Sequence, residues 1–155
     1  IGCYAVDLSR LLFGAEPTAV AGMADIDPVT GVDVLSSAVL AFPTGHATFT
    51  VSTRGELDQR VTVLGSAGRV EIEIPFNIPP DRPTRVWHTA GGEPPTDPDT
   101  ETLTFPATDQ YRLQAEAFAA AVREGRPAPL DPEGAVANLA VLDDVRARGR
   151  SSPGG

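Results

Sequence analysis

A phenol and a carboxylate lie three residues apart near the start of the chain, at Tyr4 and Asp7. On a helix this spacing places both side chains on one face. Such a pair can hydrogen-bond a polyol or carry a proton. A plainer interpretation makes Tyr4 a core residue and pairs Asp7 with Arg10, three residues further on. Spacing alone favours the plainer interpretation.

Other chemistry-bearing side chains give weaker signals. His46 and His88 match no metal-binding spacing, and the single cysteine, Cys3, excludes an internal disulfide and a cysteine-rich zinc site. We therefore expect no metal. Glu71 and Glu73 alternate onto one strand face, which we expect to be solvated. A carboxylate-based hydrolase that uses this pair is the weakest hypothesis.

Composition narrows the function classes. The 155 residues include 12 basic residues, all Arg, and 21 Asp and Glu, for a net charge of −9. A negative chain repels phosphate backbones and anionic lipid, so we expect neither nucleic-acid nor membrane partners. The absence of Lys from the sequence excludes lysine-based chemistry within this chain. No apolar run is long enough to span a membrane, and a cytoplasmic location is expected.

Two motifs are missing from the sequence. It contains no Gly-x-Ser-x-Gly nucleophile elbow and no Gly-x-Gly-x-x-Gly dinucleotide-binding turn. A serine hydrolase therefore has no support, and we expect no cofactor-binding residues in this chain.

Periodicity predicts three helices and seven strands. A helix over 1–13 presents Tyr4, Leu8, Leu11 and Leu12 on one face and ends at Gly14. Alternation predicts strands at about 18–27, 32–42, 46–54, 59–65, 69–75, 84–89 and 100–105. Two closing helices are expected, capped at Thr108 or Asp109 and at Asp131. Their apolar sides are predicted at Tyr111, Ala115, Phe118 and Val122, and at Val136, Leu139, Ala140 and Leu142.

The expected fold class is α+β, with a large open, mainly antiparallel sheet and helices packed on one face. Short connections favour antiparallel neighbours. Three helices cannot cover both faces of seven strands, so the open face is polar or covered by a second copy. Residues 1–150 are expected to form one domain, followed by a frayed tail at 151–155. The chain begins within an apparent helix, and we interpret it as part of a longer protein.

The stretch 1–14 resembles the start of the C-terminal domain of the Gfo/Idh/MocA oxidoreductases. The family motif is Asp-x-Gly-x-His/Tyr, and its last four positions are matched by Ile1, Gly2, Cys3 and Tyr4. Its Asp would lie one residue before Ile1. Similar stretches follow at 63–70, 75–77 and 114–148, so the resemblance covers nearly the whole chain. A Tyr at the motif's last position is similar to the glucose–fructose oxidoreductase and dihydrodiol dehydrogenase branch.

The resemblance implies a two-part enzyme. An N-terminal Rossmann domain, absent here, would bind NAD or NADP and carry the principal acid/base Lys in a Glu-Lys-Pro motif. Tyr4 would lie beside the reacting oxygen of the substrate and assist catalysis. Asp7 matches a position that is acidic in only some members, so its implied role in substrate binding is weak.

We therefore interpret the chain as the substrate-binding and dimerisation domain of an NAD(P)-dependent dehydrogenase. The substrate would be a sugar, polyol or related hydroxy compound, and the domain would be inert without its Rossmann partner. Homo-oligomers would form through the open sheet face, where Thr48, Thr50 and Ser52 make a polar row. The alternative is a stand-alone binding or assembly module that has the same sheet and no enzymatic activity.

Overall fold

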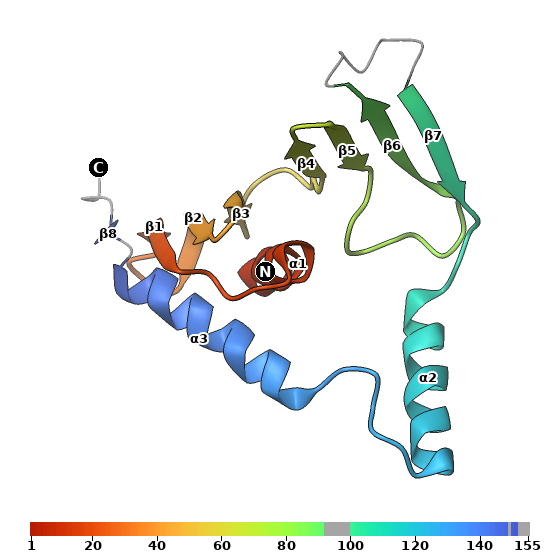
Figure 1. The fold of residues 1–155 in the computed structure, drawn as a ribbon. Coiled ribbons are helices and arrows are strands. Elements are labelled where there is room, and N and C mark those ends of the chain that lie inside the picture. Colours follow the sequence, from red (N-terminus) through yellow and green to blue (C-terminus); the bar gives the residue numbers. More distant parts are fainter. Residues whose placement is uncertain (92–99, 149, 152–155) are drawn as a thin grey trace. The chain divides into compact units, whose positions relative to one another are not determined.

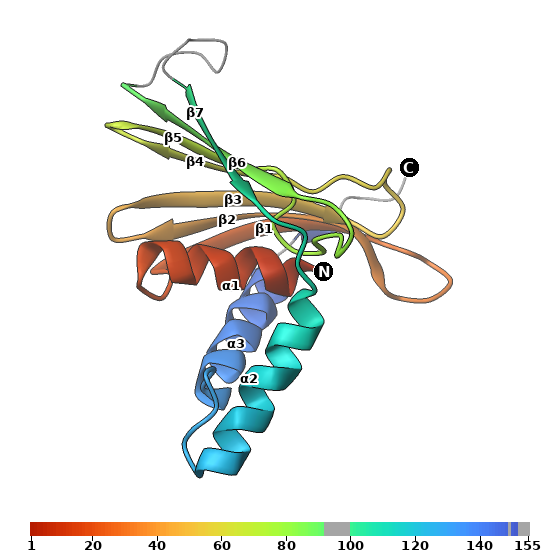
Figure 2. The same ribbon diagram turned by 90° about the vertical axis from the view of Figure 1, so that its right-hand side faces the viewer.

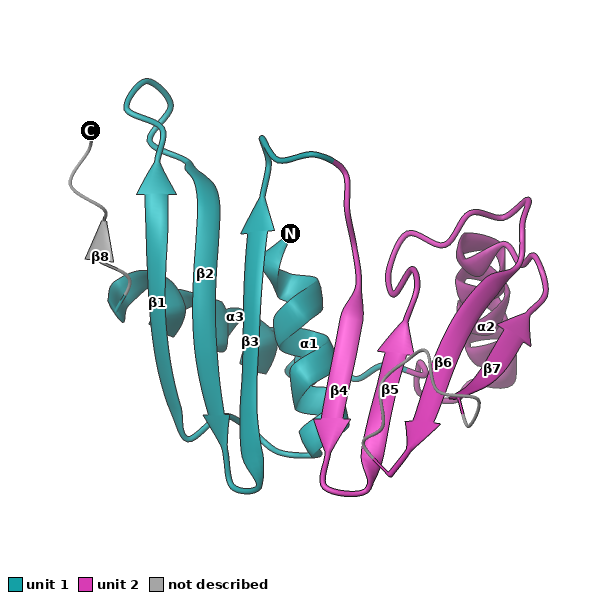
Figure 3. Cartoon of the chain, turned by 90° about the horizontal axis from the view of Figure 1, so that it is seen from above, with its two compact units in different colours: residues 1–56, 130–155 teal, residues 57–129 magenta. Residues whose placement is uncertain are grey.

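The computed structural model describes residues 1–91, 100–148 and 150–151. The chain divides into two compact units, residues 1–56 with 130–155 and residues 57–129 (Figure 3). Within the described residues, each unit contains one four-stranded sheet.

The first unit combines one sheet with two helices. Its strands are β1 (Ala19–Ile26), β2 (Asp33–Phe42), β3 (Gly45–Ser52) and the short β8 (Arg150–Ser151), in the order β3-β2-β1-β8. Strands β1, β2 and β3 pair antiparallel, and β8 runs parallel to β1. Helices α1 (Gly2–Phe13) and α3 (Pro132–Arg148) lie on the same face of this sheet (Figures 1 and 2).

The second unit is an antiparallel meander followed by a helix. Its sheet has the order β4 (Val61–Gly65), β5 (Gly68–Ile72), β6 (Thr84–Ala90) and β7 (Thr100–Phe105), with every neighbouring pair antiparallel. Helix α2 (Gln110–Glu124) follows β7 in the chain.

The α+β class and the mainly antiparallel pairing are confirmed. The seven strands predicted from alternation all occur, most within two residues of the expected bounds. They are, however, divided between two sheets, where the sequence predicts one continuous sheet: three join the short β8, which was not predicted, and the other four form the second sheet. Eight residues separate β3 from β4, which is long enough for the chain to leave the first sheet before the second begins. Of the tail expected at 151–155, all but Ser151 lies outside the described residues.

The predicted helix ends are confirmed by their hydrogen bonds and dihedral angles. The Asp109 carboxylate accepts bonds from the backbone N–H groups of Tyr111 and Arg112, as an N-cap should. Asp131 accepts a bond from the Glu133 N–H at 3.1 Å, directly before the first turn of α3. Gly14 ends α1 in the left-handed conformation, with φ 60°.

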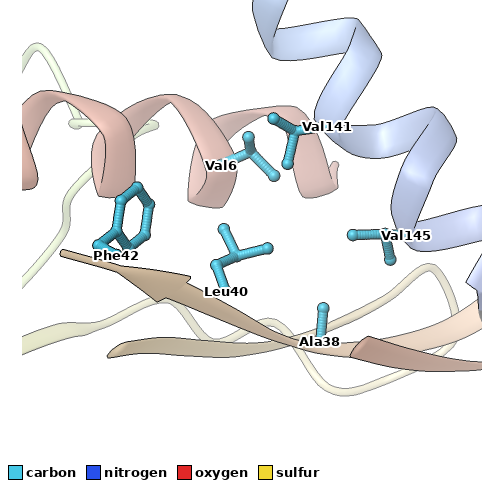
Figure 4. Close-up of a cluster of buried hydrophobic side chains, with 6 residues drawn as sticks. All are labelled: Val6, Ala38, Leu40, Phe42, Val141 and Val145. Carbon is cyan, nitrogen blue, oxygen red and sulfur yellow. The ribbon is translucent and has the colours of Figure 1, made fainter. Parts of the chain in front are cut away.

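The core of the first unit lies between β2 and the two helices. Its buried side chains come from α1, β2 and α3 (Figure 4): Val6, Ala38, Leu40, Phe42, Val141 and Val145. Phe13 stacks on Phe42, with ring centroids 4.3 Å apart and planes 7° from parallel. Alternation along β2 thus directs every second residue, from Ala38 to Phe42, toward the helices.

The buried faces of α1 and α3 differ from those the sequence predicts. On α1, Val6 is completely buried, whereas Leu11 and Leu12 are exposed. Val136 and Leu139 of α3 are likewise exposed. The buried residues of α3 are instead Asn138, Val141 and Val145. Both helices carry apolar residues on more than one side, so periodicity does not identify which side meets the sheet.

The apolar side predicted for α2 occurs but is exposed in this chain. Tyr111, Phe118 and Val122 are each at least 60% exposed, and Ala121 is the helix's buried residue. The helical pattern is therefore correct, while the expected burial is not. A repeat of apolar residues predicts a surface that favours contact with another element, and that element need not belong to the same chain.

The turn between β4 and β5 generates a prediction about packing. A Cβ on Gly68 would lie 2.5 Å from the backbone oxygen of Thr89, whereas a Cβ on Gly65 would have no neighbour closer than 3.6 Å. Gly68→Ala should therefore lower the free energy of unfolding by about 1–3 kcal/mol, because backbone must shift to relieve the overlap. Gly65→Ala, the matched control, should stay within about 0.5 kcal/mol. Urea denaturation of both variants is the measurement, and equal midpoints would contradict the packing argument.

Candidate functional site

The first turn of α1 carries Tyr4 and lies close against the rest of its unit. A Cβ on Gly2 would lie 3.3 Å from Leu142 Cδ2 and 3.8 Å from Phe49 Cε2. The first of these separations is shorter than an ordinary contact, so a larger residue would push the helix away from α3 and β3. Gly2 therefore allows α1 to approach α3 and β3 closely, and this approach fixes the position of the first helical turn, which carries Tyr4.

The structure places Tyr4 and Asp7 on accessible parts of α1. Tyr4 is 48% exposed, so the core role offered by the plainer interpretation is wrong for this residue. The Asp7 side chain is 70% exposed and lies 3.8 Å from Arg10 Nη1, at the i,i+3 spacing predicted for an ion pair. A phenol hydroxyl can both donate and accept a hydrogen bond, so a tyrosine exposed to this degree can contact a ligand. The roles of both residues in substrate binding stay predictions.

Arg10 links α1 to the segments on either side of it. Its guanidinium donates to both carboxylate oxygens of Glu16, at 2.6 to 3.1 Å, and to the Gly134 carbonyl oxygen at 3.0 Å. The Arg10 side chain is only 13% exposed. The hydrogen bond from Arg10 lowers the pKa of Glu16, and the same bond raises the pKa of Arg10. Through Arg10, the C-terminal half of α1 is therefore held to the Glu16 carboxylate, which precedes β1, and to the Gly134 carbonyl of α3.

Glu71 and Glu73 are not the solvated carboxylates that alternation predicts. Their side chains are 18% and 15% exposed. Both are paired with guanidinium groups, Glu71 with Arg69 at 3.1 Å and Glu73 with Arg85 at 2.6 Å. The bond from Arg85 lowers the pKa of Glu73. A general acid needs a raised pKa, so this pairing argues against the carboxylate-based hydrolase.

Trp87 of β6 is contacted by the guanidinium groups of Arg85 and of Arg60, the residue before β4. The guanidinium carbon of Arg85 is 5.3 Å from the indole centroid, and that of Arg60 is 6.0 Å from it. Strand pairing sets Trp87 directly opposite Glu71. The ion pairs and the indole therefore lie together on one face of the second sheet. Sequence alternation did not reveal these contacts, because they join residues on different strands.

The histidines lie on different sheets. His46 is in β3, and His88 is in β6, 3.9 Å from Glu101. Among residues 1–91, 100–148 and 150–151, no group of three or more His, Cys, Asp or Glu side chains could hold a metal ion. In the same part of the chain, no helix combines the length and apolar character needed to cross a membrane.

A hollow in the first unit lies away from Tyr4. It has a volume of about 320 Å³, and Glu16, Pro17, Val20, Val141 and Asp144 are among its lining residues. Neither Tyr4 nor Asp7 lines it. The candidate site is therefore an exposed helical turn, and this hollow does not contribute to it.

Comparison with known sequences identifies relatives along almost the whole chain. The family model described as GFO/IDH/MocA C-terminal domain matches residues 1–71. An uncharacterized oxidoreductase of Rhizobium meliloti is 39% identical over 147 residues, which cover 94% of this chain and 44% of the relative. D-xylose 1-dehydrogenase (NADP(+)) 2 of Haloferax volcanii is 32% identical over 147 residues, which cover 94% of this chain and 43% of the relative.

Solved structures share the fold. The 3-ketoreductase KijD10 from Actinomadura kijaniata, in complex with NADP, superposes with a TM-score of 0.85 at 24% identity, covering 97% of this chain and 47% of that one. The aldose–aldose oxidoreductase from Caulobacter crescentus gives a TM-score of 0.77 at 22% identity, covering 96% of this chain and 44% of that one. At these identities the likeness shows the fold alone.

The family model, the curated relatives and the shared fold together define the class of this chain, the C-terminal domain of an oxidoreductase. The chain belongs to the Gfo/Idh/MocA oxidoreductase family, as the resemblance of its first helix implies. It spans a little under half the length of the two curated relatives described above.

The Arg10–Glu16 pair predicts a defined pH dependence of stability. Because Arg10 lowers the folded-state pKa of Glu16, the pair stabilises the fold above the unfolded pKa of about 4.3 and loses this effect as pH falls through the folded value. Glu16→Gln should thus lower the free energy of unfolding by about 0.2–1 kcal/mol at pH 7, since the Glu16 side chain is largely exposed. The difference from wild type should vanish well below pH 4.

Denaturant titrations at pH 7 and pH 3 measure this difference. Asp144→Asn is the control, because its ion pair with Arg148 is exposed and 3.8 Å long. If Glu16→Gln lowered the free energy of unfolding by the same amount at pH 3 as at pH 7, the electrostatic explanation would be contradicted.

Proposed function

We propose that residues 1–150 form the substrate-binding and oligomerisation domain of a longer NAD(P)-dependent oxidoreductase. The substrate is a sugar, polyol or related hydroxy compound. The observation that carries the proposal is the position of Tyr4, half-exposed in the first turn of α1 at the family motif's His/Tyr position. One relative is a D-xylose dehydrogenase that uses NADP(+), and one structural neighbour is a 3-ketoreductase in complex with NADP; both support the substrate class and the cofactor.

The exposed helix faces support the proposal that the enzyme has a further domain. Leu11 on α1, Phe118 on α2 and Val136 on α3 all present apolar surface that this chain leaves uncovered. A Rossmann domain elsewhere in the parent protein would cover part of this surface. It would also bind the nicotinamide cofactor, because the described residues include no Gly-rich turn that opens a helix.

Tyr4 is proposed to act on the oxygen of the reacting carbon. Its hydroxyl can donate a hydrogen bond to a carbonyl oxygen or accept one from an alcohol, and so it orients and polarises that group. When bound, the nicotinamide supplies the hydride chemistry. The chain contains no Lys, so the principal acid/base implied by the family must come from another part of the enzyme. Asp7, one turn further along α1, is a weaker candidate for a substrate hydroxyl.

The test of this function uses the full-length enzyme. Tyr4→Phe should lower kcat/KM by roughly 10–100-fold, because an assisting proton donor contributes at the lower end of general acid–base effects. The assay follows nicotinamide absorbance with D-xylose and a panel of aldoses and polyols, using NAD⁺ and NADP⁺ separately. Tyr111→Phe, which changes the other tyrosine of this chain, is the matched control and should retain activity.

Two results would overturn the proposed function. The first is a wild-type enzyme that turns over no member of the panel. The second is turnover by the 155-residue chain alone, which we expect to be inert. The alternative, a stand-alone binding module, would be favoured by an upstream reading frame without a Gly-rich turn and a Glu-Lys-Pro motif. We also propose that the enzyme is cytoplasmic.

We further propose that two copies associate through the open face of the first sheet. This face is opposite the helices and consists of small, apolar and hydroxyl side chains together with His46 and Asp25. Its other members are Ala19, Ala21, Met23, Leu35, Ser37, Val39, Ala41, Thr48, Thr50 and Ser52. Met23 and Val39 are about half-exposed. In a chain of net charge −9, a face with so little charge is suited to contact its own copy.

Light scattering tests the oligomer. The chain should be dimeric at high micromolar concentration, and Val39→Glu should shift it toward monomer, because a two-fold interface would place two added carboxylates close together. Val29→Glu is the charge-matched control, since Val29 lies in the exposed β1–β2 turn. A monomeric wild-type chain, or equal dissociation by both variants, would contradict this interface.

A further inference from the structure

Helix α3 holds α1 at three points spaced four residues apart. On one side of α3, Gly134 accepts from Arg10 at 3.0 Å, Asn138 Nδ2 donates to the Cys3 carbonyl oxygen at 3.1 Å, and Leu142 lies against Gly2. The contacts run along α1 from its last turn to its first. The central contact reaches the residue that directly precedes Tyr4.

Asn138 is an unusual residue for this position. It is 9% exposed, in a helix whose other buried residues are Val141 and Val145. Its Nδ2 has one partner, the Cys3 oxygen, whereas its Oδ1 is buried and has no hydrogen-bond partner among the described residues. A buried amide with an unsatisfied oxygen is less favourable than an aliphatic side chain of similar size. Packing alone therefore does not explain Asn138.

The Cys3 carbonyl does not need Asn138 for its own hydrogen bond. Cys3 lies within α1, where helical geometry gives its oxygen the N–H of Asp7, four residues on. The bond from Asn138 is thus an additional one, and its effect is directional. It fixes how far α1 lies along α3 and how its first turn is rotated.

The geometry points to Asn138 as a positioning residue that sets the direction of the Tyr4 phenol. Asn138 acts through the Cys3 carbonyl and does not itself reach a substrate. That this direction matters for turnover rests on the proposed oxidoreductase function, whereas the effect of Asn138 on Tyr4 does not. The two statements can therefore fail separately.

The first experiment measures the surroundings of Tyr4 without any substrate. The chain has two tyrosines, so 3-fluorotyrosine labelling gives two ¹⁹F resonances, assigned with Tyr111→Phe. Asn138→Leu, which keeps the volume and removes both polar atoms, should shift the Tyr4 resonance and leave that of Tyr111 unchanged. Asn138→Asp, which keeps the shape and replaces the donor by an oxygen, should also displace the Tyr4 resonance at pH 8.

The matched control is Val145→Ala. Val145 is buried on the same helix, two turns from Asn138, and packs against Gly22 on β1. This variant loosens the same core without touching the first turn of α1. An unmoved Tyr4 resonance in both Asn138 variants would overturn the inference, and so would an equal shift in Val145→Ala.

The second experiment measures catalysis in the full-length enzyme with D-xylose and NADP⁺. Asn138→Leu should lower kcat by roughly 10–100-fold with little change in KM, because a displaced catalytic group weakens the reacting geometry more than binding. Val145→Ala should leave kcat near the wild-type value. Equal kcat in Asn138→Leu and wild type would overturn the catalytic consequence. No turnover by wild type on any sugar overturns the proposed function, and the ¹⁹F result then still decides the positioning role.

Discussion

Close contact between α1, α3 and the inner face of β2 is the constraint on which the first unit depends. Leu40 and Val6 are completely buried in this contact, which removes large apolar side chains from water. Small residues make it possible, because a Cβ on Gly22 would lie only 3.0 Å from Val145 Cγ1. The same close approach carries the first turn of α1, and Tyr4 with it, to a fixed place beside α3.

Arginine provides the polar connections in both units. Arg10 binds Glu16 through two nitrogens and Gly134 through a third, which a single ammonium could not do with the same geometry. In the second unit, Arg85 pairs with Glu73 and stacks on Trp87. An acidic chain without Lys thus uses its few cations where a planar, forked donor is needed. The absence of Lys also separates the binding role proposed for this domain from the acid/base role expected elsewhere.

Several apolar surfaces have no cover within this chain. The exposed side of α2 includes Phe118 and Val122, and Leu139 of α3 is exposed as well. A chain that spans less than half of the relatives described above is expected to leave some of its contacts unmade. The predicted helical repeats are therefore correct as patterns, and they are wrong only as statements about burial inside these residues.

The sequence by itself determined the α+β class, the seven strands, the helix caps at Asp109 and Asp131, and the family, because these depend on local dihedral preferences and on short motifs. Tertiary structure alone decided the division into two sheets, the burial of Val6 in place of Leu11 and Leu12, and the pairing of Glu71 and Glu73 with arginines. It also decided the contact between Asn138 and Cys3. Those residues are 135 positions apart, and periodicity measures only neighbours within a few turns, so no local pattern could bring them together.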